Sequence, residues 1–330
     1  MGDAIRWGVL GVANIARRAV IPAMQRSGNG RLAAIASRER ARAEEAAREF
    51  GFARAHGSYE ALLDDPDVQA VYIPLPNALH REWTIRCAES GKHVLCEKPL
   101  ALSPAECGEM IAACREHRVL LMEAFMYRFH PRTEEVARLV RAGDLGEVRM
   151  VRAAFTFQAT NPARNVRFRP ELGGGALYDV GCYTINVSRM VLGEPEEVFA
   201  CGRIGEHGVD EQVGAVLRFG RGRLALIDCG LTLPRREEYE VLGTQAYLRV
   251  PRAFLPGTAD SEIEIWRAAE RTSRSIPGAE QYQRMLEQFG HAIATGSSVG
   301  LPPDDASRNV GVICALLASL RSGKPEPVAH

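Results

Sequence analysis

Short apolar runs alternate with segments of helical periodicity over the first third of the chain. The apolar runs, rich in Val, Ile and Leu, lie at residues 5–10, 31–36, 68–73, 93–96 and 119–122. The helical patterns lie at residues 14–27, 39–49, 78–90 and 104–117. Strands that alternate with helices of this length predict a parallel sheet with helices on both faces.

After residue 124 the pattern changes to an alternation of period two. Strands are predicted at 147–157, 197–204, 211–219, 223–231, 237–242, 246–250 and 262–267, and helices at 131–142 and 304–321. Strands joined by turns without intervening helices indicate an open, mainly antiparallel sheet in an α+β domain. We therefore predict an α/β domain over 1–124 and a second domain over 125–330, whose closing helix can also pack back on the first.

Composition and charge narrow the class of partner. The 330 residues are 46% hydrophobic, and 41 basic residues balance 41 acidic ones. Without a basic excess, a nucleic-acid or anionic-membrane partner is not expected. No apolar run approaches the roughly 18 residues of a membrane span, and no signal peptide is recognised, so we expect a cytoplasmic protein. A small neutral or weakly charged substrate fits this balance better.

Cysteine and histidine spacing argues against a metal site. The eight cysteines show no C-x-x-C pair, and the histidines form no H-E-x-x-H or H-x-x-x-H pair. We expect reduced core cysteines and no bound metal.

The first predicted strand ends in a turn typical of dinucleotide binding. Gly11 would make the tight turn, and Ala13, Asn14 and Ile15 would open a helix whose N-terminus offers N–H groups to a pyrophosphate. Ala13 replaces the usual second glycine and slightly crowds the approach of a phosphate. A strand–glycine–helix turn without a nucleotide is the alternative.

The second predicted strand ends at Ser37-Arg38. An NAD site would place Asp or Glu there for the ribose hydroxyls, whereas an arginine suits the 2′-phosphate of NADP. The alternative is that Arg38 only begins the next helix. Its place at the carboxyl end of the strand favours NADP.

Two further loops follow predicted strands at the same edge of the sheet. Pro74, Leu75, Asn77 and His80 belong to a rigid loop at the position where ligands bind in such folds. The run Cys96-Glu97-Lys98-Pro99 carries one of only three lysines, with Lys92 and Lys324. A half-buried lysine there could lower its own pKa or that of a neighbour. The alternatives are a plain turn and a solvent-facing Lys–Glu pair.

Residues 171–193 contain three consecutive glycines followed by a row of polar side chains. Three consecutive glycines, 173–175, allow a close backbone approach, and a following helix would place Asp179 and Tyr183 on one face with Asn186 on the adjoining turn. An aspartate and a tyrosine together can polarise a hydroxyl and exchange its proton. An amphipathic helix with a surface aspartate is the alternative.

Two motif matches carry no function. Residues 296–300 match G-x-S-x-G, but a helical pattern precedes them where a nucleophile elbow needs a strand, so we expect a helix end and a loop. Asn186-Val187-Ser188 matches the glycosylation sequon, which has no meaning without secretion.

These motifs in this order resemble the Gfo/Idh/MocA oxidoreductase family. The residues that carry the resemblance are the turn at 11–16, Ser37-Arg38, YIPLPNALH, CEKPL, MEAFMYRFHP and GGGALYDVGCYTIN. Many members carry D-x-G-x-H-x-x-D, whereas here Tyr183 stands in the His position and Asn186 in the last Asp position. The pattern resembles the tyrosine branch, which includes dihydrodiol dehydrogenases, NADP-dependent xylose dehydrogenases and glucose–fructose oxidoreductase.

The resemblance implies a Rossmann domain, an open-sheet domain, and hydride transfer between NAD(P) and a pyranose sugar or cyclic diol. It implies that Lys98 and Tyr183 form the proton-transfer pair and that Asp179 orients the substrate. A ketoreductase of a nucleotide-linked deoxysugar is the alternative enzyme, and a non-catalytic NADP-binding regulator is the third possibility. We further expect a homodimer or homotetramer, because the predicted helices are too few to cover both faces of the second sheet.

Overall fold

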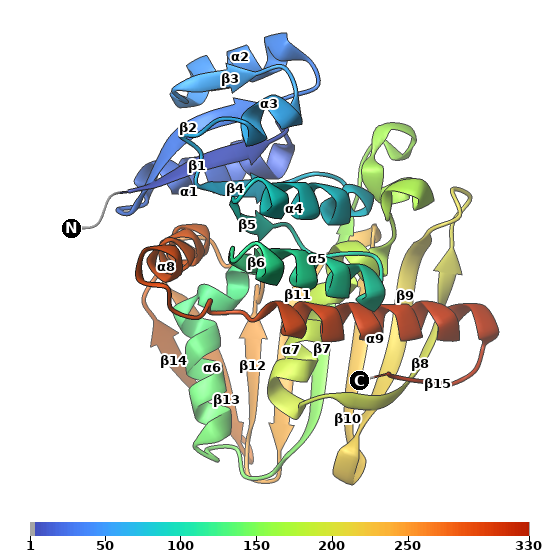
Figure 1. The fold of residues 1–330 in the computed structure, drawn as a ribbon. Helices are drawn as coiled ribbons and strands as arrows, with labels where there is room; N and C mark the ends of the chain where they lie inside the picture. The colour runs from blue at the N-terminus through green and yellow to red at the C-terminus, as the bar shows by residue number, and fades with distance from the viewer. Residues whose placement is uncertain (1–3, 330) are drawn as a thin grey trace. The chain divides into compact units, whose positions relative to one another are not determined.

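The computed structural model describes residues 4–329 (Figure 1). These residues form two compact units. The first unit comprises residues up to Met126 together with Glu280–Ser307, and the second comprises Tyr127–Ala279 and the residues from Arg308 onward. The sequence prediction had placed everything after residue 124 in the second domain. Glu280–Ser307 instead packs with the first unit.

The first unit is built on a six-stranded parallel sheet of order β3-β2-β1-β4-β5-β6. Its strands are β1 (Ile5–Leu10), β2 (Gly30–Ala36), β3 (Arg54–His56), β4 (Ala70–Ile73), β5 (His93–Cys96) and β6 (Leu121–Glu123). The chain runs outward from β1 to β3 and then returns to β4 beside β1. The strand order reverses between β1 and β4, and in sheets of this kind ligands bind at the carboxyl ends of the strands at such a reversal. The predicted parallel sheet is confirmed, and the short strand β3 is an addition to it.

Helices of the first unit connect these strands, except the last one named here, which comes much later in the chain. They are α1 (Ile21–Arg26), preceded by a π-helical turn η1 (Ala16–Val20), α2 (Arg40–Phe50), α3 (Tyr59–Leu63), η2 (Asn77–Leu79), α4 (His80–Glu89), α5 (Pro104–Glu116) and α8 (Gln281–Thr295). Ser103 caps α5, since its hydroxyl accepts the Glu106 N–H at 3.2 Å.

Helix α8 explains why a late segment joins the first unit. The Phe289 ring lies 5.9 Å from the Trp7 ring of β1, and both side chains are fully buried. The Asn29 amide donates to the Glu287 carbonyl at 2.8 Å. The helix ends at Gly296 in the left-handed region, so the G-x-S-x-G match is a helix end and a loop, as predicted.

The second unit is built on a nine-stranded sheet of order β14-β13-β12-β11-β7-β10-β9-β8-β15. Its strands are β7 (Val148–Gln158), β8 (Pro195–Ile204), β9 (Asp210–Phe219), β10 (Arg223–Gly230), β11 (Thr232–Gly243), β12 (Tyr247–Pro251), β13 (Ser261–Arg267), β14 (Glu270–Ile276) and β15 (Glu326–Pro327). Every pairing is antiparallel except that of β7 with β10. The predicted mainly antiparallel sheet is therefore confirmed, with β14 and β15 added at its two edges.

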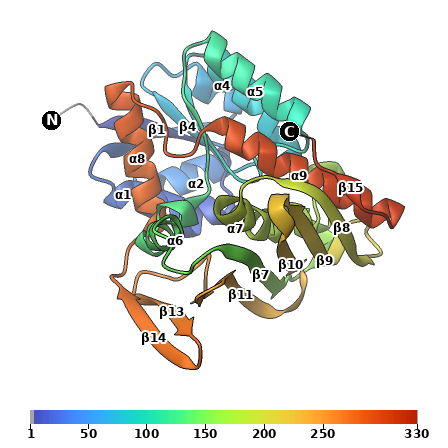
Figure 2. The same ribbon diagram turned by 90° about the horizontal axis from the view of Figure 1, so that it is seen from below.

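One face of this sheet is packed by helices. Figure 2 shows α6 (Pro131–Arg141) and α7 (Cys182–Leu192) on the same side of the sheet. Alternate residues of β7, including Val151, Ala153 and Phe155, are buried under them. Helix α9 (Pro303–Ser322) crosses the division between the units. The remaining short helical turns are η3 (Met126–Phe129), η4 (Pro162–Arg164), η5 (Val166–Phe168), η6 (Pro170–Leu172), η7 (Leu177–Gly181) and η8 (Gly220–Gly222).

On the opposite face of the sheet, one row of side chains runs across the strands. The row is apolar at one end and charged at the other. Phe199, Val216 and Leu226 lie side by side on β8, β9 and β10, and the first two are 39% and 37% exposed. The row continues through residues of alternating charge, namely Arg152, Glu240, Arg249 and Glu264. Because opposite charges at neighbouring positions of adjacent strands attract one another, the charged part is neutralised within the chain, whereas the apolar part is left without cover.

A buried carboxylate holds the start of the helix that contains residues 177–192. Asp210 Oδ2 accepts the Leu177 N–H at 2.7 Å. Gly175 adopts φ +122°, and a Cβ there would collide with the Asp210 carboxylate. Burial raises the pKa of Asp210 to about 6, although the N–H groups of Leu177 and Ala176 favour its ionised form.

All eight cysteines are free thiols, and six are buried as predicted, but Cys201 on β8 is exposed. Among residues 4–329, no helix combines the length and the apolarity that a bilayer crossing needs.

Asp210→Asn should remove one pH dependence of stability. The folded pKa of about 6 lies above the ordinary value of 3.8, so protonation of Asp210 stabilises the fold below about pH 4, and this contribution is lost as the pH rises through 6. The amide keeps an acceptor oxygen but does not titrate. We expect the wild-type protein to lose about 3 kcal/mol relative to the variant between pH 4 and pH 7. Urea unfolding at each pH measures this, and a constant difference would contradict it.

We propose that a second copy of the chain covers the apolar part of the open sheet face. Val216→Glu places a charge in the middle of the Phe199–Val216–Leu226 row without disturbing the core. We expect it to convert a dimer or tetramer into a monomer in light scattering at micromolar concentration. Arg48→Glu, on α2 of the other unit, is the control. A monomeric wild-type protein would refute the proposal.

Candidate active site

The turn after β1 has the geometry of a dinucleotide-binding turn. Gly11 has φ +93°, and a Cβ there would lie 3.2 Å from Leu75 and 3.4 Å from the Tyr59 hydroxyl. The helical conformation begins at Asn14, and the Arg17 N–H already bonds to the Ala13 carbonyl at 3.1 Å. The N–H groups of the first turn have no partners within a helix, so the segment from Ala13 to Ile15 can hold a phosphate.

Arg38 reaches this turn from the end of β2. Ser37 is buried, and its hydroxyl accepts the Glu39 N–H at 3.2 Å, whereas Arg38 is exposed. Burial raises the pKa of Tyr59, and the charge of Arg38 and its hydrogen bond to the Tyr59 hydroxyl oppose that rise. The guanidinium therefore lies beside the tyrosine that contacts the Gly11 turn. This is a suitable place for a 2′-phosphate.

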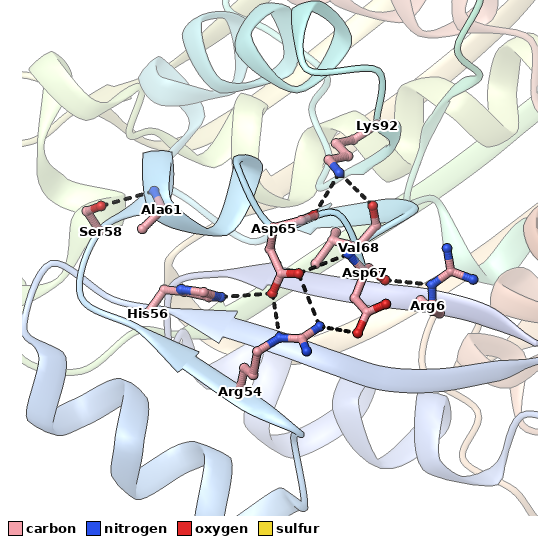
Figure 3. A network of polar contacts seen from close by, with 9 residues as sticks. All are labelled: Arg6, Arg54, His56, Ser58, Ala61, Asp65, Asp67, Val68 and Lys92. Atoms are coloured by element: carbon pink, nitrogen blue, oxygen red, sulfur yellow. Dashed lines mark hydrogen bonds and ion pairs between the residues drawn. The ribbon is translucent and has the colours of Figure 1, made fainter.

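A network of charges fixes the loop that follows α3 (Figure 3). The Arg54 guanidinium binds both Asp65 oxygens, at 2.7 and 3.1 Å, and Asp67 at 2.7 Å. His56, whose carbonyl accepts the Ser37 N–H, contacts Asp65 at 3.1 Å. These contacts join β3 to the loop after α3. Tyr59 is the first residue of α3.

Lys92 takes part in the same network and has a structural role. It is buried, and its ammonium donates to the Asp65 and Val68 carbonyls, each at 2.8 Å (Figure 3). Burial lowers its pKa. Lysine is rare in the sequence, and this rarity drew attention to Lys92 as well as to Lys98, although Lys92 has a structural role.

His80 connects the two loops that follow β4 and β5. It is fully buried, with Nε2 2.9 Å from the Leu75 carbonyl oxygen and Nδ1 2.9 Å from that of Pro99. Burial lowers the pKa of His80, and the neutral ring has only one N–H to donate. Pro74 and Leu75 are also buried, and Asn77 is half-buried. His80 thus holds the loops in place, and its predicted contact with a cofactor stays a prediction.

The loop that carries Lys98 is held at both ends by carboxylates. Glu97 accepts the Tyr72 hydroxyl at 2.6 Å and the Lys98 N–H at 3.3 Å. Burial and the nearby Glu97 charge hold the pKa of Tyr72 well above its ordinary value, so Tyr72 remains a donor. Beyond a cis peptide bond between Lys98 and Pro99, the Leu100 N–H donates to the buried carboxylate of Glu123 at 2.9 Å. Lys98 itself is half-buried.

In the second unit, Asp179 and Tyr183 lie one helical turn apart. Asp179 belongs to the π-helical turn η7, which continues directly into α7, and π-turns are frequent at functional sites. Its Oδ2 accepts the Arg167 Nε–H at 2.5 Å. Tyr183 is 5% exposed, and its ring lies 5.2–5.9 Å from those of Phe254, Phe155 and Tyr127.

Asn186 is buried in the next turn of the same helix. Its Oδ1 accepts the Tyr127 hydroxyl at 2.5 Å and the Arg128 Nη1–H at 3.1 Å. The residue that replaces the family's aspartate therefore has its own donors, supplied by the chain just before α6.

Several residues of these arrangements were not predicted as site residues. Arg167 lies in a segment without a recognisable chemical motif, and Tyr72 lies in a predicted strand and in YIPLPNALH, where it received no role. Tyr127, Arg128 and Glu123 lie within MEAFMYRFHP, which contributed to the resemblance but received no role. Lys98 belongs to the first unit and Asp179 and Tyr183 to the second, so their action as one set stays a prediction.

Comparisons with known proteins agree with this description. The Gfo/Idh/MocA oxidoreductase family model, described as an NAD-binding Rossmann fold, matches residues 5–125, and the Gfo/Idh/MocA C-terminal domain model matches residues 133–249. The chain is 39% identical to D-xylose 1-dehydrogenase (NADP(+)) 2 of Haloferax volcanii, over 96% of this chain and 98% of that protein.

Two further relatives differ in their substrates. Trans-1,2-dihydrobenzene-1,2-diol dehydrogenase of Xenopus tropicalis is 35% identical over 75% of this chain and 76% of that protein. A crystal structure of a 3-ketoreductase from Actinomadura kijaniata with NADP and TDP-benzene has a TM-score of 0.92 and 33% identity, and covers 96% of this chain and 98% of that one. The chain therefore belongs to the Gfo/Idh/MocA oxidoreductase family and is an NAD(P)-dependent dehydrogenase or reductase.

Proposed function

We propose that the enzyme transfers hydride between NADP and a carbinol or carbonyl carbon of a pyranose sugar or cyclic diol. The observation that carries this proposal is the position of Tyr183, a buried phenol one helical turn from Asp179. Relatives named for a pentose sugar and for a cyclic diol support the substrate class.

The proposed residues supply the proton path of the reaction. When bound, the nicotinamide accepts hydride from the carbinol carbon or returns it to the carbonyl. As hydride leaves, the hydroxyl becomes strongly acidic, and the Tyr183 oxygen takes its proton. Free tyrosine, with a pKa near 10, is a poor base at neutral pH, but the Lys98 ammonium would stabilise its phenolate. Asp179 would orient the reacting hydroxyl.

The choice of NADP follows from the end of β2. An exposed arginine stands where an NAD site has an acidic residue, and it lies beside Tyr59 at the glycine turn. A relative named for NADP and a structure that contains NADP support the same choice.

A ketoreductase of a nucleotide-linked deoxysugar is the second candidate. The similarity to the Actinomadura kijaniata structure over nearly the whole chain favours it. In that case the same groups would work in the direction of reduction, with Tyr183 giving its proton to the carbonyl oxygen.

A substrate screen tests both candidates. NADPH absorbance is followed with monosaccharides, cyclic diols and nucleotide-linked ketosugars, in the direction of oxidation or reduction that each permits. Turnover of free sugars or diols supports the first proposal, and turnover restricted to nucleotide-linked ketosugars supports the second. Tight NADPH binding without turnover of any of these compounds would refute both and indicate a regulator.

Lys98→Arg and Tyr183→Phe should each reduce turnover by about 10²–10⁴. Arginine keeps the charge but replaces a compact ammonium with a wide planar fork, and phenylalanine removes only the hydroxyl. NADP binding should survive Tyr183→Phe. The double variant should be little worse than the poorer single one, because the two groups act as a unit. Near-normal turnover of Tyr183→Phe would make Asp179 the next candidate for the base.

Arg38→Ala should weaken NADP binding several-fold to a hundredfold, which corresponds to about 1–3 kcal/mol for a charge-assisted hydrogen bond. NAD binding should hardly change, because NAD lacks the 2′-phosphate. Arg40→Ala is the matched control, since Arg40 is also exposed and pairs with Glu44 on its own helix. Fluorescence titration with both cofactors measures the effect, and equal losses for NADP and NAD would rule out the assigned role of Arg38.

A further inference from the structure

We propose that Arg167 sets the protonation state of Tyr183, as an electrostatic positioning residue that neutralises Asp179. The inference rests on the proposed function, in which Tyr183 exchanges a proton with the substrate. It assigns a role to a residue outside the Lys98, Asp179 and Tyr183 set.

The backbone of Arg167 is fixed against the start of the helix that carries Asp179 and Tyr183. Its N–H donates to Asn165 Oδ1 at 3.1 Å, and its carbonyl accepts the Gly175 N–H at 2.9 Å. A Cβ on Gly174 would lie 2.5 Å from the same carbonyl oxygen. The consecutive glycines therefore allow the loop and the helix start to touch.

The side chain of Arg167 contacts the same helix at Asp179, one turn beyond the point where its carbonyl binds Gly175. Its Nε lies 2.5 Å from Asp179 Oδ2, and its guanidinium lies 5.5 Å from the centre of the Phe157 ring. The arginine side chain is 39% exposed and the aspartate 17% exposed, so solvent screens the pair only in part. The charge of Asp179 raises the pKa of Arg167, and Tyr183 adds to the rise, so the phenol lies within electrostatic range of the guanidinium.

The pair has a direct consequence for the phenol. A guanidinium does not lose its proton, so it neutralises Asp179 at every working pH. Without it, Asp179 would lose the positive charge that lies 2.5 Å from its carboxylate oxygen, one turn from Tyr183. A nearby negative charge raises the pKa of a phenol, and a nearby positive charge lowers it, typically by about one to three pH units. Arg167 therefore favours the phenolate that oxidation requires.

Other ionisable groups of the second unit lie near Tyr183 or near the helix that carries it, and they stay unchanged in the test. Tyr127 packs against the Tyr183 ring, Arg128 binds Asn186 on the next turn, and the Tyr239 ring packs against Phe254, which also contacts Tyr183. Asp210 binds the start of the same helix, Cys229 lies against Gly181, and the charge of Arg132 acts on Tyr239.

The test compares Arg167→Met with Asp179→Asn, because the two changes have opposite signs. In the direction of oxidation, kcat rises with pH as the base ionises. Arg167→Met should move this rise to higher pH by about one to two units, with turnover recovering above it. Asp179→Asn should move it to lower pH, whatever its effect on the maximum, and the double variant should return close to the wild-type position. Arg167→Lys should restore most of the shift.

Arg169→Met is the matched control. Arg169 lies two residues further along the same loop and pairs only loosely with the exposed Glu171, at 3.6 Å. It should leave the pH profile unchanged. An equal loss of kcat at every pH in Arg167→Met, without a shift, would show a merely structural role and overturn the proposal.

A second readout needs no substrate and separates this inference from the proposed function. Ultraviolet difference titration follows phenolate formation, with the same protein carrying Tyr183→Phe as the blank. The Tyr183-dependent signal should appear at higher pH in Arg167→Met and at lower pH in Asp179→Asn. If these shifts occur but Tyr183→Phe stays active, the proposed base is wrong and the role of Arg167 holds. If the wild-type protein shows no Tyr183-dependent signal, or Arg167→Met leaves it unmoved, the inference is wrong.

Discussion

Close backbone contact at two glycines determines where the helices of the proposed site begin. Gly11 turns β1 into the first helix with φ +93°, against Leu75 and the Tyr59 hydroxyl. Gly175 lies between the Arg167 carbonyl and the Asp210 carboxylate with φ +122°. A side chain at either position would strain the backbone and push neighbouring segments apart. Both helices also begin with a π-turn, which changes the direction of the side chains that follow.

Buried hydrogen bonds hold the loops around Lys98. The His80 ring nitrogens lie 2.9 Å from the carbonyl oxygens of Leu75 and Pro99, and the neutral ring donates to one of them. The carboxylates of Glu97 and Glu123 accept backbone N–H groups on both sides of the cis peptide bond. Leaving such a buried group unsatisfied costs about 1–3 kcal/mol, so each partner restrains the others. Lys98 is thus presented by a rigid loop, which suits the proton-transfer role proposed for it.

The surroundings of Tyr183 are apolar on one side and charged on the other. Aromatic rings exclude water from the phenol, and in such a setting each nearby charge has a larger effect than in water. An aspartate at position 186 would add a second negative charge to this helix, and the asparagine does not. With Asp179 bound to Arg167 as well, the helix presents little net charge to the phenol. A tyrosine can act as a base only where its anion is not opposed in this way.

The pattern of hydrophobic and polar residues predicts the two kinds of sheet and the positions of the chemical groups along the chain. Hydrophobic periodicity reports which side of an element is buried, and that distinguished the parallel sheet from the antiparallel one. Gly11, Arg38 and Lys98 were recognisable because each follows a predicted strand, and Tyr183 because it shares one face of a predicted helix with Asp179. The strand β14 could not be recognised from the sequence, because six of its seven residues are exposed and show no alternation of buried and exposed positions.

Tertiary structure decided which distant residues meet. Arg54 with Asp65, His80 with Pro99, Arg167 with Asp179, and Asp210 with the start of the residue 177 helix are separated in sequence by other elements. It also assigned α8 to the first unit, through Trp7 and Phe289. Periodicity describes how one element faces its surroundings, but not which element it faces. That pairing depends on the packing of all the elements together, since a contact forms only where shape, charge and hydrogen bonds are satisfied at once.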